Sequence, residues 1–422
     1  MWMKWFTDWG RKFSSFNRNV KLFIIGNALI QIGMGVFMVM YNLYIRELGM
    51  PETVSGKVIS MTAMASAIML VPAGFLSDKF GRKWMIVGGA VLTVTTLFYR
   101  GIAVAETPII TAAFLTGLFM AFVQVSGIPF LAENSSPAER VTLFSVNFAV
   151  VTIANVAGSF FGGVIADVLE TVMKISTTEA IRYSLLCGAA IFTAGLLPFF
   201  KLQEKNAKEE KAAPLLSDGG KIDQLEDRLK RNLIVIFHFS FANLLIGFGS
   251  GLVVPYLNLY FANRFDATNS YIGFVLSMGS AMTAVAAMIG PALSKKIGKV
   301  RALILFQMLS IPFLLLTAYT TSLMLASLGF LLRQALMNAG NPIQSAVAME
   351  VVSDKYKGLA NSMNQMVFNL GWATMGPIAT GLVVAQGAYW GYAFAFTITA
   401  GLYIVSSIYY YFIFGRRKLS GE

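Results

Sequence analysis

Residues 74–89 read GFLSDKFGRKWMIVGG and carry four charges within six residues: Asp78, Lys79, Arg82 and Lys83. Apolar segments at 54–76 and 84–104 lie on either side of this charged stretch. A hydrocarbon core about 30 Å thick is crossed by a helix of about 20 apolar residues. The stretch is therefore predicted to be a charged turn between two membrane-spanning helices.

The composition of the chain is that of a membrane protein. Of its 422 residues 56% are apolar, a further 38 are glycine and only 13% are charged, with a mean hydropathy of +0.66. Soluble chains reach roughly 45–50% apolar residues with glycine included. A single cysteine, Cys187, and a single histidine, His238, exclude an internal disulfide and a Cys- or His-rich metal centre. No metal or cofactor is expected. The net charge of +12 is spread over the loops, which argues against nucleic-acid binding.

Apolar runs long enough to span a bilayer recur twelve times along the chain. Because a lipid-exposed backbone must satisfy its own hydrogen bonds, each run is predicted to be a helix. The fold class is therefore an all-α polytopic membrane protein with twelve transmembrane helices. The predicted spans are 20–45, 54–76, 84–104, 108–132, 141–166, 180–200, 232–261, 269–293, 300–319, 322–349, 357–385 and 388–414.

The polar segments divide the chain into five predicted parts. Residues 20–200 and 232–414 are two six-helix bundles, and 201–231 is a cytoplasmic linker, partly helical after Gly220. The segment 1–19 places tryptophan and phenylalanine among basic residues, which predicts an amphipathic helix on the lipid of the inner leaflet. The tail is 415–422. We expect a monomer.

The distribution of basic residues predicts the orientation. With the N-terminus inside, 26 of the 33 Lys and Arg residues lie on the cytoplasmic side and five lie outside, with two within spans. Cytoplasmic loops of membrane proteins carry such an excess. Both termini are therefore predicted to be cytoplasmic, in a multi-pass protein of the cytoplasmic membrane.

The two halves repeat each other. Asn27 and Asn243 begin a run of matches at an offset of 216, and after one inserted residue the offset becomes 217, as in Gly56 and Gly273. Two parallel six-helix halves with a site between them are the architecture of transporters that work by alternating access.

The quoted stretch resembles the loop signature of the major facilitator superfamily, and the weaker second copy is PALSKKIGKVR at 291–301. The resemblance covers essentially the whole chain. It implies that Asp78 and Arg82 brace the two halves on the cytoplasmic side. Asp78 is expected to face the positive end of the helix that starts near Lys357. The second copy has Lys295 in place of Asp78, so we expect an asymmetric brace.

A second set of charges extends this predicted cytoplasmic gate. Glu133 and Arg140 lie seven residues apart, and Glu350 and Lys357 repeat that spacing in the second half. Sugar carriers of the family look similar at this junction. Glu133 is expected to pair with Arg82 or Lys83 when the inner side is closed. The alternatives are that Lys79, Arg82 and Lys83 only set the topology and that Glu133 is an ordinary solvated charge.

Two features of proton-coupled drug exporters of this family are missing. Their fourth helix carries an arginine, which 108–132 lacks. Their fifth helix carries a Gly-Pro break, which the fifth span here lacks and which instead appears at Gly376–Pro377 in the eleventh span. The branch within the family is left open.

Arg333 is the main candidate for substrate binding. It lies about eleven residues, or ~17 Å, from the outer end of its span, near the middle of the bilayer. Ionisable residues at this depth are functional candidates, and a guanidinium binds an anionic group with two parallel hydrogen bonds. A structural arginine is the alternative. Further candidate substrate-binding residues are Gln334, Asn338 and Asn341 near Arg333, Asn27 and Gln31 in the first span, and Asn243 in the seventh.

The coupling of transport to an ion has few candidate residues. No Asp or Glu lies deep in a span, which leaves Glu133 and His238 as candidates to carry a proton. His238 is more easily explained as structural. Arg100, near the outer end of its span, is expected to extend toward the membrane surface.

Three functions fit these patterns. The first is secondary active transport of a small organic solute by alternating access, most readily a proton-coupled, multidrug-like exporter or antiporter. The second is a carrier of an organic anion or lipid-linked sugar that uses Arg333. The third is a non-transporting membrane sensor on the same fold. An enzyme is not expected, and the ATP-binding pattern GxxxxGK[ST] is absent from the sequence.

Overall fold

The structure is a computed structural model that describes residues 16–136, 139–204, 222–341, 343–344, 347 and 357–414. The side chains of 140–142, 145, 222–232, 284, 287–292, 295 and 357–362 are outside this description. The predicted amphipathic segment 1–19, most of the linker 201–231, Glu350 and the tail 415–422 therefore fall largely or wholly outside the described residues.

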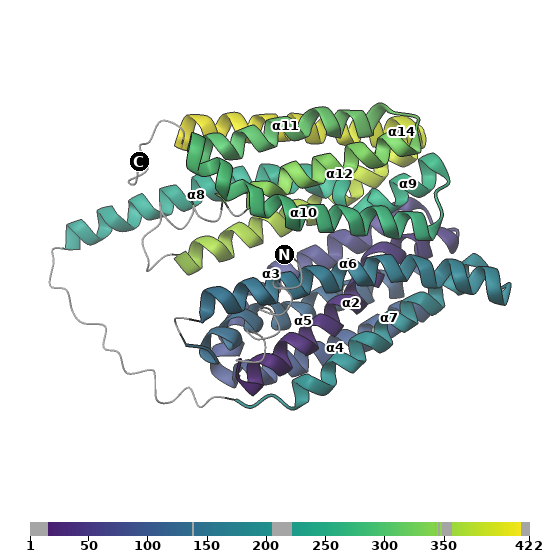
Figure 1. Cartoon of the computed structure of the whole chain (residues 1–422), viewed down its shortest axis with the longest axis horizontal. Helices are drawn as coiled ribbons and strands as arrows, with labels where there is room; N and C mark the ends of the chain where they lie inside the picture. The colour runs from purple at the N-terminus through teal and green to yellow at the C-terminus, as the bar shows by residue number, and fades with distance from the viewer. Residues whose placement is uncertain are drawn as a thin grey trace, which may run out of the picture. The chain divides into compact units, whose positions relative to one another are not determined.

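The first six predicted spans are all helices (Figure 1). Five of these helices extend past one or both ends of the apolar run that predicts them, whereas α4 both begins and ends two residues before its predicted run. They are α2 (Arg18–Glu47), α3 (Glu52–Phe80), α4 (Arg82–Ile102), α5 (Glu106–Glu133), α6 (Arg140–Met173) and α7 (Thr177–Phe200).

In the part of the chain that the structure describes, the last six spans are also helical, with two main interruptions. Pro255 cannot donate a backbone hydrogen bond, and the seventh span breaks there into a long helix, a single 3-10 turn and a short helix. Gly387, with φ of 74°, separates the eleventh and twelfth spans within one long element. The elements are α8 (Ile222–Val253), η1 (Val254–Tyr256), α9 (Leu257–Phe265), α10 (Asn269–Ile297), α11 (Lys299–Tyr319), α12 (Leu323–Ala339) and α14 (Lys357–Phe414).

The twelve-helix membrane fold is thus confirmed in its main features. Within the described residues, nine helical stretches are long and apolar enough to cross a membrane, two of them spanning the interruptions above, and α12 is a shorter apolar helix. The helix α8 begins at Ile222, inside the predicted linker. The helix α12 ends at Ala339, and after Gly340 the described residues of the tenth predicted span, 341, 343–344 and 347, are again helical.

The chain forms two compact units that do not follow the chain order throughout. The first unit holds Met1–Gly49, Ile68–Lys205 and Thr268–Ser277, and the second holds Met50–Ala67, Asn206–Ala267 and Met278–Glu422. The first part of α3 therefore belongs to the second unit, and the first part of α10 belongs to the first. The predicted bundle boundaries at 20–200 and 232–414 stay a prediction.

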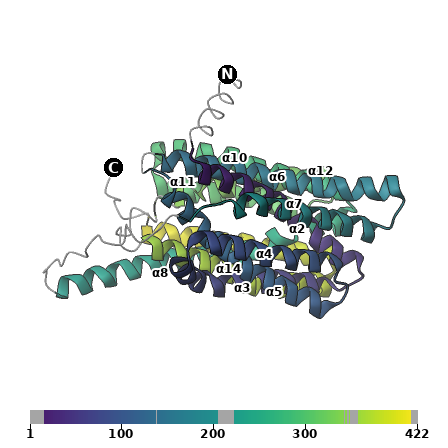
Figure 2. The ribbon, with the colours of Figure 1, turned by 90° about the horizontal axis from the view of Figure 1, so that it is seen from below.

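Small residues allow the helices within each unit to approach closely. In the first unit α2 packs on α6 and α7 (Figure 2), and a Cβ on Gly195 of α7 would lie 2.8 Å from the carbonyl oxygen of Gly26 on α2. In the second unit α8 packs on α14, where a Cβ on Gly371 would lie 2.5 Å from the carbonyl carbon of Gly247. Such contacts are typical of helix packing in membranes.

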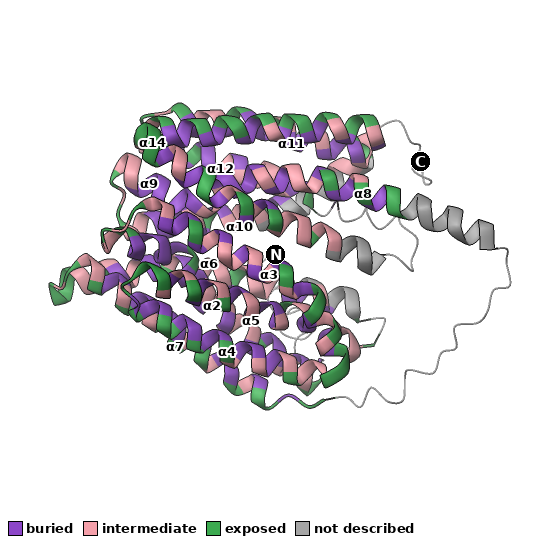
Figure 3. Cartoon of the chain, turned by 180° about the vertical axis from the view of Figure 1, so that it is seen from behind, coloured by how far each residue is buried: buried purple, intermediate pink, exposed green. Residues whose placement is uncertain are grey.

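Apolar side chains are exposed along the outer faces of these helices. On α4 the buried residues, such as Ile86, Ala90 and Leu97, occupy one face, whereas Leu92 and Phe98 on the other face are exposed (Figure 3). A soluble protein rarely exposes so much apolar surface. These faces fit contact with lipid.

Candidate functional site

The charged stretch at 74–89 forms a tight turn between α3 and α4. Gly81 is the only residue between the two helices, and its φ of 98° lies in a region that favours glycine. Its N–H donates to the carbonyl of Ser77 at 3.1 Å. The turn places Asp78 at the end of α3 and Arg82 at the start of α4, four residues apart.

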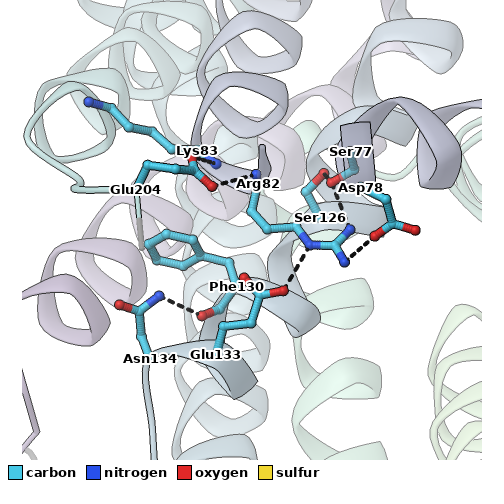
Figure 4. Close-up of polar contacts among 9 residues, drawn as sticks. All are labelled: Ser77, Asp78, Arg82, Lys83, Ser126, Phe130, Glu133, Asn134 and Glu204. Atoms are coloured by element: carbon cyan, nitrogen blue, oxygen red, sulfur yellow. Dashed lines mark hydrogen bonds and ion pairs between the residues drawn. The ribbon is translucent and has the colours of Figure 1, made fainter. Parts of the chain in front are cut away.

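Arg82 is the centre of a polar network at this end of the first unit (Figure 4). Its guanidinium donates to the Ser77 hydroxyl at 3.0 Å, to the Glu133 carboxylate at 3.2 Å and to the Asp78 carboxylate. The Ser77 hydroxyl also lies 2.7 Å from that of Ser126. One side chain therefore joins the end of α3, the start of α4 and the end of α5. The predicted pairing of Glu133 with Arg82 is present.

Glu204, which follows α7, completes the network from the other side of the turn. Its two carboxylate oxygens accept the backbone N–H groups of Arg82 and Lys83, each at 2.9 Å. These N–H groups belong to the first turn of α4 and have no partner within their own helix. A carboxylate also interacts favourably with the positive end of the helix dipole. Nothing in the sequence indicates this contact, because Glu204 lies in the predicted solvated linker.

The other predicted gate residues take different positions. The Lys79 ammonium lies 5.5 Å from the ring centre of Phe80, and that of Lys83 lies 5.1 Å from the ring of Trp84. Phe80 and Trp84 are both exposed. The side chains of Arg140, Glu350 and Lys357 are outside the described residues. The expected contact of Asp78 with the helix that starts near Lys357 stays a prediction.

Arg333 is buried in the second unit, with 3% of its surface exposed. Its guanidinium donates to the Gln334 side chain at 2.8 Å and to the Tyr403 hydroxyl at 2.9 Å. The guanidinium carbon lies 5.8 Å from the ring centre of Tyr403, and Nε is buried without a hydrogen-bond partner. Arg333 is thus buried within the protein, its predicted depth in the bilayer stays a prediction, and Tyr403 on α14 is a partner that the sequence did not indicate.

The remaining predicted substrate residues form hydrogen bonds inside their units. In the second unit Asn338 donates to the Gln334 carbonyl at 2.8 Å, and Asn341 donates to Asn338 at 3.0 Å. Asn243 accepts a hydrogen bond from Gln344, which also donates to the Tyr410 hydroxyl at 2.9 Å. In the first unit Asn27 donates to Asn147 at 3.4 Å, and Gln31 is partly buried on α2.

His238 and Arg100 both contact tyrosines. His238 Nδ1 lies 2.5 Å from the hydroxyl of Tyr409, which fits a structural role. Arg100 does not extend to the surface as the sequence suggests, since only 7% of it is exposed and its guanidinium carbon lies 3.8 Å from the ring centre of Tyr41. Stacking on an aromatic face stabilises a cation in an apolar setting.

The spanning helices with apolar outer faces, the close glycine contacts and the charged network at one end define a multi-pass membrane transporter fold. The family model of the Major Facilitator Superfamily matches residues 23–241 and 239–421. The chain belongs to this superfamily.

Similar proteins and structures cover almost the whole chain. An uncharacterized MFS-type transporter of Methanocaldococcus jannaschii is 26% identical over 84% of this chain and 88% of its own length. Multidrug resistance protein MdtG of Salmonella choleraesuis is 26% identical over 97% of this chain and 98% of its own.

Among solved structures, a bacterial homologue of the human lysosomal transporter Spinster aligns with a TM-score of 0.75 at 14% identity, over 93% of this chain and 95% of that chain. The nucleoside transporter NupG aligns with a TM-score of 0.74 at 16% identity, over 95% and 100%. These structures support the fold alone.

Proposed function

We propose that this chain is a secondary active transporter that exports small organic solutes by alternating access, driven by protons. The observation that carries the proposal is the similarity over nearly the full length to a protein named for multidrug resistance. The orientation proposed from the basic residues, with both termini in the cytoplasm, places the Arg82 network on the cytoplasmic side.

The Arg82 network has the features of a conformational gate. Arg82 ties three helices together through hydrogen bonds whose partners Asp78 and Glu133 remain partly exposed, with side-chain exposures of 60% and 37%. Ion pairs with this exposure contribute little stability. They are therefore suited to break and form again during a transport cycle, and we propose that Asp78, Arg82 and Glu133 control opening on the linker side.

A second candidate function is the transport of an organic anion or lipid-linked sugar. It is favoured by Arg333, whose buried guanidinium forms no salt bridge with a carboxylate of the described residues and whose Nε has no hydrogen-bond partner. An anionic substrate group would supply the missing charge. A non-transporting sensor on the same fold is the third candidate.

Flux into proteoliposomes separates these functions. The purified full-length chain is reconstituted, and uptake of a fluorescent lipophilic cation and of a radiolabelled aromatic carboxylate is followed with and without an imposed pH gradient. The proposal expects gradient-dependent movement of the cation, and the second candidate expects that of the carboxylate. Movement of neither, above the level of liposomes without protein, would contradict both and favour the sensor. The variant Gly88→Ala is a folding control, because no heavy atom lies within 4 Å of the Cβ that it adds.

A further inference from the structure

The start of α3 crosses α14 at two glycines, at the end of the helices away from the linker. A Cβ on Gly56 would lie 2.8 Å from the carbonyl oxygen of Gly376, and a Cβ on Gly376 would lie 2.5 Å from the carbonyl oxygen of Gly56. Both residues belong to the second unit. This crossing holds the first part of α3 in the second unit, although the rest of the helix belongs to the first.

The start of α10 makes a matching crossing with α6 in the first unit. A Cβ on Gly273 would lie 2.7 Å from the carbonyl oxygen of Ser159 and 3.6 Å from the Cα of Gly163. Gly273 corresponds to Gly56, and Ser159 to Gly376, at the offset of 217 that relates the two halves of the sequence. The two crossings are therefore equivalent positions of the repeat.

A carboxylate closes the first crossing. Glu52, the first residue of α3, accepts hydrogen bonds from the side-chain amide of Asn263 on α9 and, at 3.5 Å, from the hydroxyl of Tyr392 on α14. The same amide also donates to the Tyr392 hydroxyl at 3.3 Å. Tyr392 is buried, with 3% of its surface exposed. Glu52 thus ties the start of α3 to two elements of the second unit.

A second carboxylate stabilises the crossing of α10 with α6. It lies on α6, the helix that receives the start of α10, whereas Glu52 lies on α3 itself. Asp167 on α6 accepts the backbone N–H of Ser270 at 2.7 Å, and Ser270 is the second residue of α10. The N–H groups of a first helical turn have no partner within the helix, and the positive end of the helix dipole favours an anion there. The equivalent of Asp167 in the second half is Val384, so the two carboxylates are not related by the repeat.

We propose that Glu52 and Asp167 are proton-binding latches. Glu52 holds the start of α3 in the second unit, and Asp167 holds the start of α10 in the first unit. Each carboxylate acts as an acceptor, and protonation removes the negative charge that strengthens these hydrogen bonds. A proton bound at either site therefore favours release of the crossing. Acid on this side of the membrane is therefore expected to promote opening of this side.

Other charged and titratable groups lie near Glu52 and Asp167 in the sequence or contact them. Tyr392 faces Glu52, Lys57 follows on the same helix, and Arg264, next to Asn263, donates instead to the carbonyls of Ala318 and Thr320. After Asp167 the next such groups along the chain are Glu170 on α6, which accepts from Thr177 at 2.8 Å, and Lys174, which directly follows α6. Tyr271 follows Ser270 on α10.

The inference rests on the proposed alternating-access transport, but its test requires no substrate. In a Cys187→Ser background, spin labels are placed at the exposed positions Pro51 and Gln386 for the first crossing, and at Thr268 and Val172 for the second. Distance distributions are measured in nanodiscs from pH ~8 to pH ~4, a range that covers the usual pKa of carboxyl groups. We expect a longer distance to gain population in acid, by up to about tenfold per pH unit for each linked proton.

The variants identify the titrating groups. Glu52→Gln should remove the pH dependence at the first crossing only, and Asp167→Asn at the second only. Tyr392→Phe keeps the Glu52 carboxylate but removes one donor, so it should move the midpoint of the first transition to higher pH. The control Glu179→Gln alters an exposed carboxylate in the first turn of α7 and should change neither curve.

Two results would overturn the proposal. One is a pH dependence in Glu52→Gln and Asp167→Asn that equals that of the parent protein. The other is a pair of distances that do not respond to pH in the parent protein. Absence of solute flux with normal distance titrations would instead contradict the proposed function and leave the latches standing.

Discussion

Glu204 lies directly over Gly81, and the two residues together set the start of α4. A Cβ on Gly81 would lie 2.8 Å from the Cδ of Glu204, so the carboxylate reaches the first N–H groups of α4 only because the turn residue has no side chain. The φ of 98° at Gly81 requires the same residue for a separate reason. The turn therefore depends on glycine twice.

Substitution of this glycine is expected to destabilise the protein. Gly81→Ala introduces both a strained backbone and a collision with Glu204, for which we expect a loss of about 1–3 kcal/mol. The matched control is Gly88→Ala within α4, where no heavy atom lies within 4 Å of the new Cβ and we expect a gain of about 0.5–1 kcal/mol. Thermal unfolding in detergent measures both. Equal melting temperatures for the two variants would contradict this account of the turn.

Removal of the cap should have a smaller effect. Glu204→Ala leaves two N–H groups of α4 to water, and the loss of a helix N-cap is typically about 1 kcal/mol. Glu204→Gln keeps one acceptor oxygen but loses the charge that faces the helix dipole, so its effect should be intermediate. Unfolding of both variants at neutral pH and low salt tests this order. The prediction fails if the Gln variant is the less stable of the two.

Arg82→Lys separates charge from geometry in the proposed gate. A lysine keeps the positive charge but cannot form the planar set of hydrogen bonds to Ser77, Asp78 and Glu133 at once. We expect solute flux to fall at least about tenfold, with only a small change in melting temperature because the partners are partly exposed. Lys79→Arg, outside the Arg82 hydrogen bonds, is the control. Normal flux in Arg82→Lys would reduce the network to a topology signal.

Tyr403→Phe tests whether Arg333 is held for structure or for substrate. The variant removes one acceptor of a buried guanidinium, and an unsatisfied buried group costs about 1–3 kcal/mol. We expect lower thermal stability, which saturating substrate should partly restore if an anion binds Arg333. Tyr409→Phe, which removes a hydroxyl beside His238, is the comparison. A destabilisation that no anionic solute reverses would assign Arg333 to the structure.

Glu133→Gln addresses coupling on the linker side. The variant keeps an acceptor for Arg82 but cannot release a proton, so solute exchange should continue while its response to a pH gradient is lost. His238→Ala should change little. Counterflow and gradient-driven uptake in the same proteoliposomes distinguish the two activities. Full gradient-driven uptake by Glu133→Gln would show that Glu133 is only a gate charge. Glu52 and Asp167, at the ends of their helices away from the linker, would then be the remaining candidates for proton coupling.

Local properties of the chain determined the fold class. Apolar runs of sufficient length must become helices in lipid, and the glycine and charges at 74–89 predict the turn between α3 and α4 without knowledge of any distant residue. The position of Arg333 within its span likewise follows from counting along one helix, and its depth in the bilayer stays a prediction. The repeat offset of 217 identifies Gly56 and Gly273 as equivalent positions from the sequence alone.

Only the tertiary structure decided which distant residues meet. Glu204 caps α4 from 122 positions away, and Tyr392 reaches Glu52 from 340 positions away. Arg100 is buried because the ring of Tyr41 on another helix covers it. A single sequence fixes the length and the faces of a helix through local hydrogen bonding and hydropathy. It does not specify the helix that each face contacts, because that choice depends on packing summed over the whole unit.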